Sequence, residues 1–153
     1  MRQENIYNLL GRNLGYLPTE DQSGCMRQLA DFVADNTNDV IFLMTGYAGT
    51  GKTSLIASLV STLTTLRQKS VLLAPTGRAA KVLRSYSGKE AYTIHRKIYR
   101  QKSATDGVGK VVLVRNLHKE TFFIVDEASM IPDDSSEGSM FGSGRLLEDL
   151  LEY

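Results

Sequence analysis

The chain lacks a pair of cysteines, a long apolar run and a secretion signal, three features that would each place it in a special class of protein. It contains one cysteine, Cys25, among 153 residues, so an internal disulfide bond is excluded. Its longest uninterrupted run of strongly apolar residues, 40–44, is far too short to span a bilayer. Residues 1–5 lack the apolar core that a secretion signal needs. These absences favour a soluble protein with no membrane partner, and we expect a cytoplasmic location.

The charges are distributed unevenly along the chain. The net charge is only +1, but residues 67–102 hold ten basic side chains and one acidic one, Glu90, which gives this segment +9 and leaves −8 for the remainder. This asymmetry predicts a polyanionic partner, and tyrosines among the cations can stack on unpaired bases. A solvated basic surface is the alternative. The basic residues are Arg67, Lys69, Arg78, Lys81, Arg84, Lys89, Arg96, Lys97, Arg100 and Lys102, interleaved with Tyr86, Tyr92 and Tyr99.

Residues 46–53 read Gly-Tyr-Ala-Gly-Thr-Gly-Lys-Thr and match the phosphate-loop pattern. The apolar run 40–44 precedes them, as expected of a strand buried on both faces, and helix-spaced apolar residues follow. Glycines let the backbone approach a polyphosphate, and the N–H groups that begin a helix attract anions. We predict a nucleotide-binding site, with a plain glycine-rich turn as the alternative. Its predicted members are Gly46, Tyr47, Ala48, Gly49, Thr50, Gly51, Lys52, Thr53 and Ser54.

Four side chains suggest hydrolysis of the bound nucleotide. Lys52 can reach the terminal phosphates, and the Thr53 hydroxyl can hold Mg²⁺. Asp126 and Glu127 follow an apolar run at 121–125, so in a parallel sheet both acids lie at the carboxyl edge, where ligands bind. Asp126 can complete the magnesium shell and Glu127 can orient a water, provided that a turn begins there. An acidic strand end that faces solvent is the alternative.

Strand and helix patterns alternate along the chain and predict an α/β fold, with a mostly parallel sheet and helices on both faces. We assign 1–38 to N-terminal helices packed on the domain that follows and 39–153 to that nucleotide-binding domain. That domain is thin, and the final helix carries an uncovered leucine face, so we expect the chain to be the front part of a longer protein. The expected strands are 40–44, 71–74, 111–114 and 121–125, and the expected helices are 1–15, 19–35, 54–67, 78–86, 93–99 and 145–152.

Four stretches together resemble the first motor domain of the RecD-like group of superfamily-one helicases, which includes proteins like the alpha subunit of exodeoxyribonuclease V. Residues 18–22, Pro-Thr-Glu-Asp-Gln, also resemble the glutamine motif that recognises adenine. The resemblance implies a RecA-like P-loop NTPase fold, truncated before the third helicase motif. The four stretches are the phosphate loop 46–53, Ala-Pro-Thr-Gly-Arg-Ala-Ala-Lys at 74–81, Thr-Ile-His at 93–95 and Ile-Val-Asp-Glu-Ala-Ser-Met at 124–130.

The resemblance implies further site residues when it is carried over position by position. Gln22 would hydrogen-bond the adenine. The alternative is that Gln22 only caps the helix, in a capping box with Thr19, although one side chain can fill both roles. Arg78 as a solvated helix residue and His95 as a structural histidine remain alternatives to DNA contact. The implied contacts with DNA are Thr76, Gly77, Arg78, Thr93 and His95.

We therefore expect an ATP- and Mg²⁺-dependent DNA helicase that moves 5′ to 3′ on single-stranded DNA, in repair or recombination. By resemblance, its partners would be a second, C-terminal motor domain and nuclease or repair subunits. The chain stops before the γ-phosphate-sensing motif and the arginines of that second domain, so the fragment alone should hydrolyse ATP weakly or not at all. A P-loop kinase or a nucleotide-dependent regulatory switch is the alternative, although it leaves the basic segment without a role.

Overall fold

The computed structural model describes residues 2–35, 37, 40–101, 111–132 and 142–153. The chain forms two compact units, residues 1–69 with 86–88 and residues 70–85 with 89–153. The assignment of residues 1–38 to a separate N-terminal region stays a prediction. No helix in the described ranges is both long and apolar enough to cross a membrane.

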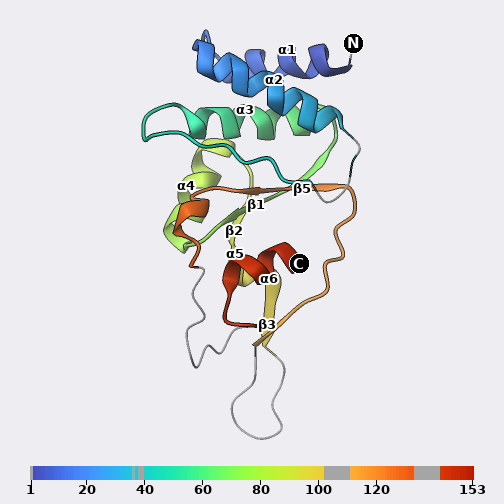
Figure 1. The fold of residues 1–153 in the computed structure, drawn as a ribbon, viewed down its shortest axis with the longest axis vertical. Helices are drawn as coiled ribbons and strands as arrows, with labels where there is room; N and C mark the ends of the chain where they lie inside the picture. Colours follow the sequence, from blue (N-terminus) through green and yellow to red (C-terminus); the bar gives the residue numbers. More distant parts are fainter. Residues whose placement is uncertain (1, 36, 38–39, 102–110, 133–141) are drawn as a thin grey trace, which may run out of the picture. The chain divides into compact units, whose positions relative to one another are not determined.

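The described residues of the first unit form the helices α1 (Arg2–Leu14), α2 (Glu20–Ala34) and α3 (Lys52–Thr65) (Figure 1). Apolar side chains recur every four residues in α1, so Ile6, Leu10 and Leu14 are buried on one face. Helix α1 packs on both α2 and α3. Ser58 on α3 donates a hydrogen bond from Oγ to the Leu10 carbonyl (2.7 Å). This contact fixes α3, the helix that begins at the phosphate loop, against α1.

Helix α2 begins at the capping box that the sequence predicts. The Thr19 hydroxyl accepts from the Gln22 backbone N–H (3.2 Å), and Gln22 Oε1 accepts from the Thr19 N–H (3.1 Å). Two backbone donors that the first turn would otherwise leave unpaired are thereby satisfied. The Gln22 side chain consequently folds back over the start of its own helix.

The prediction of a buried strand at 40–44 is wrong. No described strand pairs with this segment, and the side chains of Val40, Ile41 and Leu43 are exposed, Ile41 to 74%. Phe42 is half-buried and its ring packs on that of Phe32, with the centroids 5.5 Å apart. The apolar residues of this extended segment let one of its sides pack on helix α2. A strand also needs a neighbouring strand with which to form hydrogen bonds, and apolar composition does not predict one.

The second unit contains a three-stranded sheet of order β2-β1-β5, formed by β1 (Lys69–Ala74), β2 (Ala91–Thr93) and β5 (Thr121–Val125). The central strand is the most buried, and it pairs with β2 in parallel, Leu72 opposite Ala91. Helix α4 (Gly77–Ser87) follows β1 and buries Ala80 and Leu83. Val82 of the same helix is 51% exposed because it lies roughly half a turn from Ala80.

A second cluster of short elements packs against one face of the sheet in this unit (Figure 1). Strands β3 (Tyr99–Gln101) and β4 (Val111–Leu113) form an antiparallel ribbon. Leu73, Ile94, Ile98, Tyr99 and Leu146 form the apolar core of the cluster. The other elements of the cluster are α5 (Ile94–Ile98) and α6 (Leu146–Glu152), whereas the 3-10 turn η1 (Ala128–Met130) follows β5 and buries no side chain.

The buried side of α6 includes a carboxylate as well as leucine. Asp149 is only 3% exposed; it accepts hydrogen bonds from the Tyr99 hydroxyl and from the Ser143 backbone N–H (2.9 Å). Gly142 lies directly against this pair, since a Cβ added there would overlap Asp149 Oδ2 and lie 2.6 Å from Tyr99 Cε1. A charged group can remain in this core because both contacts satisfy it.

Candidate nucleotide-binding site

The phosphate-loop sequence adopts a hydrogen-bonded turn that leads directly into α3. Gly49 and Gly51 have positive φ angles of 80° and 88°, which residues with a side chain rarely adopt, and Gly51 is the N-cap of α3. The Thr50 hydroxyl donates to the Tyr47 carbonyl (2.8 Å) and closes the turn, while the Tyr47 ring is 89% exposed. The glycines therefore occupy the positions where the backbone conformation requires them.

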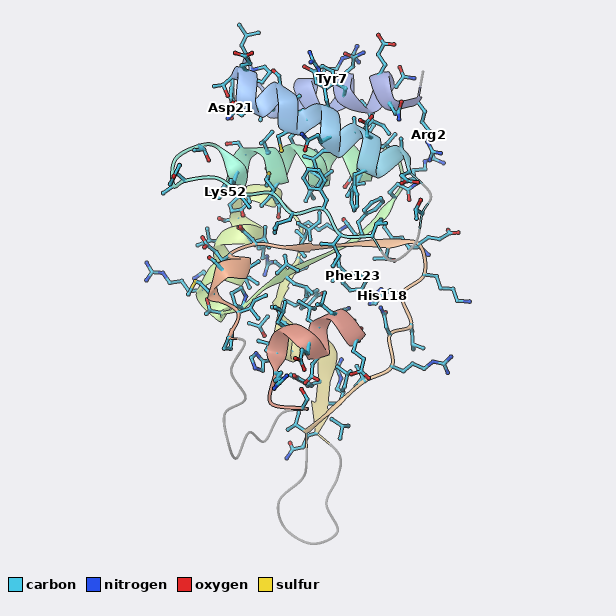
Figure 2. The ribbon with its side chains drawn as sticks, viewed as in Figure 1. Arg2, Tyr7, Asp21, Lys52, His118 and Phe123 are labelled. Atoms are coloured by element: carbon cyan, nitrogen blue, oxygen red, sulfur yellow. The ribbon has the colours of Figure 1, made fainter. Side chains whose placement is uncertain are left out.

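Lys52 is the first residue of α3, at the end of the helix that meets the loop (Figure 2). Its ammonium group donates to the carbonyls of Gly46 (2.6 Å) and Tyr47 (2.8 Å). The cation thus lies over the loop. Two neutral carbonyls satisfy part of its hydrogen-bonding capacity, and a phosphate chain carrying full negative charge would attract it more strongly.

The loop is also held from α2. Gln22 Nε2 donates to the Thr50 carbonyl (3.0 Å) and to the Tyr16 hydroxyl (3.4 Å), and the Gln22 side chain is buried. A Cβ added at Gly51 would overlap Gln22 Nε2 and lie 3.4 Å from the Tyr16 hydroxyl. The structure therefore brings Gln22 to the phosphate loop. Its predicted contact with adenine stays a prediction.

The acidic pair lies at the carboxyl end of β5 in the second unit. The Asp126 N–H donates to the Leu73 carbonyl (3.0 Å), which places Asp126 beside the end of β1. Glu127 has φ 55° and ψ 36°, in the left-handed region, and η1 begins immediately after it. The turn that both acids require does begin here. Asp126 Oδ1 accepts from the Glu127 N–H (2.9 Å), and the Glu127 side chain is exposed.

The residues predicted to contact DNA include two helix caps and one exposed cation. Thr76 Oγ1 accepts from the Ala79 N–H (3.2 Å) at the start of α4, and Thr93 Oγ1 accepts from the Arg96 N–H (3.2 Å) at the start of α5. Both hydroxyls therefore act as caps. Gly77 and Arg78 begin α4 beyond the end of β1, and both are exposed.

His95 and the cations around it lie on α5. Burial lowers the pKa of His95 and so favours its neutral form, and its ring lies 5.7 Å from that of Tyr99. The Tyr92 ring has two cations near it, Arg96 at 5.8 Å and Lys97 at 5.5 Å from its centroid. In the basic segment, Arg84 forms an ion pair with Glu90, Lys89 donates to Ser70 and Arg100 donates to the carbonyls of Arg96 and Tyr99. Lys102 lies outside the described residues.

The donor groups suit a magnesium ion carried by a nucleotide. The Thr53 hydroxyl and the Asp126 carboxylate are oxygen ligands, and nucleotide-bound Mg²⁺ needs only one or two protein ligands besides phosphates and water. Nowhere in the described ranges do three His, Cys, Asp or Glu side chains gather into a metal site of their own. The approach of Lys52 and Thr53 to Asp126, which a shared ion requires, stays a prediction.

Comparison with known families decides the class of protein. The sequence profile of a family described as an AAA domain matches residues 19–138, which is most of the chain. The chain belongs to this AAA domain family. A search of curated proteins and a search of solved structures found no match.

Membership of the AAA domain family makes the chain a P-loop ATPase domain with nucleotide-dependent activity. The parallel three-stranded sheet and its helices confirm the predicted class, a partial RecA-like α/β P-loop fold. The matched range includes the phosphate loop, the acidic pair and Gln22. The contact between the Tyr16 hydroxyl and Gln22 was not predicted from the sequence. Tyr16 precedes the matched range and belongs to no motif.

Proposed function

We propose that the chain is the ATP-binding and ATP-hydrolysing motor domain of a DNA helicase that translocates on single-stranded DNA. The proposal includes 5′ to 3′ movement, a role in repair or recombination, a second motor domain in the full-length chain, and nuclease or repair subunits as partners. ATP and Mg²⁺ are the proposed cofactors. The family supports the ATPase part, and the resemblance of 74–81 and 93–95 to helicase motifs supports the DNA part.

One observation carries the ATPase part above the others, namely the turn at 46–51 with its two positive-φ glycines, leading into a helix whose first residue is lysine. This backbone presents N–H groups and a cation to a polyphosphate. In the proposed reaction Lys52 neutralises charge on the β- and γ-phosphates. Thr53 and Asp126 hold the magnesium ion, and Glu127 orients the attacking water.

Binding of a fluorescent ATP analogue in Mg²⁺ tests the nucleotide site. Lys52→Ala is expected to weaken binding by about tenfold to a hundredfold, because a charge-assisted hydrogen bond contributes about 1.5–3 kcal/mol. Lys119→Ala removes the same charge at an exposed position and should bind normally. Equal affinity in the two variants would contradict the proposed site.

The acidic pair is tested by separating binding from hydrolysis. Glu127→Gln keeps the size of the side chain but removes the carboxylate that is proposed to polarise the water. We expect ATP binding close to that of the unchanged protein and a turnover that is lower by about a hundredfold or more in the full-length protein. Equal turnover in the two proteins would remove Glu127 from the mechanism.

The DNA part is tested by titrating labelled single-stranded DNA at two salt concentrations. Phosphate contacts predict an affinity that falls steeply with salt, and each lost contact should lower the slope of log K against log salt by about 0.7. Arg78→Ala should show that change, while Arg115→Ala, which removes an exposed arginine outside the basic segment, should not. If no binding appears even at low salt, a nucleotide-dependent kinase or switch becomes the better proposal.

A further inference from the structure

The Gln22 carboxamide connects two structures that are far apart in the sequence. Its oxygen accepts from the Thr19 N–H (3.1 Å) and completes the capping box of α2. Its nitrogen points the other way, to the Thr50 carbonyl (3.0 Å) and the Tyr16 hydroxyl (3.4 Å). The capping box uses only the oxygen, so the contact with Thr50 is additional to what the helix start needs.

The Thr50 carbonyl belongs to the peptide group that enters Gly51. A trans peptide is planar, and its C=O and N–H bonds point in opposite directions. Gln22 holds the Thr50 carbonyl on its own side, so the Gly51 N–H must point away from Gln22. The Thr50 carbonyl cannot turn away without breaking its hydrogen bond to Gln22, and Gln22 Nε2 lies where the Cβ of any residue other than glycine at position 51 would be. One buried amide thus fixes the orientation of a loop donor.

The hydrogen-bonding capacity of this amide is nearly exhausted. A carboxamide has two N–H donors and two acceptor lone pairs on its oxygen. Thr50 and Tyr16 take the donors, and Thr19 takes one lone pair. The side chain is only 7% exposed. What remains for any ligand is one lone pair, whereas the links to the loop already exist.

We propose that Gln22, supported by Tyr16, is a positioning residue for the phosphate loop and so sets its affinity for the phosphate chain, whichever base the nucleotide carries. This inference rests on the proposed ATP site. It differs from a base-recognition role in one measurable respect: it acts on a ligand that has no base.

Inorganic tripolyphosphate with Mg²⁺ is the probe, measured beside ATP by displacement of a fluorescent nucleotide. Gln22→Glu keeps the oxygen that serves Thr19 but places an acceptor against the Thr50 carbonyl. Gln22→Met removes the donor without adding charge. In each variant the affinities for ATP and for tripolyphosphate are expected to fall by the same factor. This factor is about fivefold to tenfold, as the loss of one buried hydrogen bond predicts.

Two control variants separate positioning from charge and from stability. Gln28→Glu adds the same negative charge to an exposed position of α2 and should leave both affinities unchanged. Thr19→Ala removes the capping hydroxyl and lowers stability, but leaves the link from Gln22 to Thr50 and should bind both ligands normally. Weakened binding in Thr19→Ala equal to that in Gln22→Met would reduce the effect to general destabilisation and overturn the proposal.

The decisive comparison is between the two ligands. If Gln22→Met weakens ATP and leaves tripolyphosphate unchanged, Gln22 acts on the base and the positioning role is wrong. If Lys52→Ala fails to weaken the binding of tripolyphosphate, the proposed ATP site itself fails, whatever Gln22 does.

A second variant is needed if circular dichroism shows that the Gln22 variants do not fold. Tyr16→Phe removes one hydroxyl from a half-exposed ring. It should weaken both ligands by about twofold to threefold, with Tyr7→Phe as control, and an unchanged affinity for both would overturn the proposal.

Discussion

Removal of the Tyr99 hydroxyl should destabilise the second unit by a measurable amount. Tyr99→Phe keeps the ring in its apolar cluster and deletes only the donor to Asp149. The carboxylate retains the Ser143 N–H and stays buried, at 3% exposed, with one contact fewer. Because water cannot replace the lost donor, Asp149 remains under-satisfied in a poorly solvated place.

The expected magnitude follows from the charge and the burial. A hydrogen bond to a charged group contributes about 1.5–3 kcal/mol, so we expect the free energy of unfolding to fall by about 2 kcal/mol. For a chain of this size that corresponds to a melting temperature lower by about 4–8 °C. Asp149→Asn should reduce the benefit of the hydroxyl, so the double-mutant cycle should give a coupling energy of about 1–2 kcal/mol.

Equilibrium urea unfolding monitored by circular dichroism measures both quantities. Tyr153→Phe is the matched control, because the Tyr153 ring packs on Phe123 and its hydroxyl forms no hydrogen bond among the described residues. That variant should lie within about 0.5 kcal/mol of the unchanged protein. A Tyr99→Phe variant as stable as the control, with a coupling energy near zero, would refute the assignment of this contact as a major stabilising one.

The remaining predictions concern pH, a helix cap and a glycine. Burial, together with the hydrogen bond to Asp149, raises the pKa of Tyr99, so stability should fall as pH rises above about 10, where the unfolded tyrosine ionises; Tyr99→Phe should lack this loss in urea unfolding at pH 9 to 11. Burial alone would raise the pKa of Asp149, but its hydrogen bonds lower it, so the same contact should be lost as pH falls below about 4 in acid titrations. Thr76→Ala should lower the melting temperature through loss of about 1 kcal/mol of capping, and Thr76→Ser should restore it. Gly51→Ala should abolish ATP binding in the fluorescence assay, since its φ is 88° and the added methyl overlaps Gln22.

The parts of the fold that sequence predicted well depend on neighbours a few residues apart. The capping box at Thr19 is confirmed, because a spacing of three residues sets it. The turn after Asp126 is confirmed for a related reason. Two acids at the end of a strand can serve one site only if the backbone leaves the strand there.

The parts that failed depend on partners far away in the chain. Residues 40–44 have the composition of a buried strand but no paired neighbour among the described residues. No local sequence pattern shows whether another strand will form hydrogen bonds with such a segment. The three-residue strands β2 and β3 are too short to give a periodic signal. Asp149 reads as a solvent-facing position of an amphipathic helix, yet a tyrosine 50 residues earlier allows its burial. The sequence likewise did not predict the contact between Gln22 and Thr50, which are 28 residues apart.

The backbone of Glu127 has a consequence for attempts to make the protein more robust. A left-handed conformation costs a residue with a side chain about 1–2 kcal/mol, and glycine avoids most of that cost. A screen that rewards heat resistance alone should therefore enrich Glu127→Gly, which discards the carboxylate that we propose orients the attacking water. At this position thermal endurance and turnover would be selected in opposite directions.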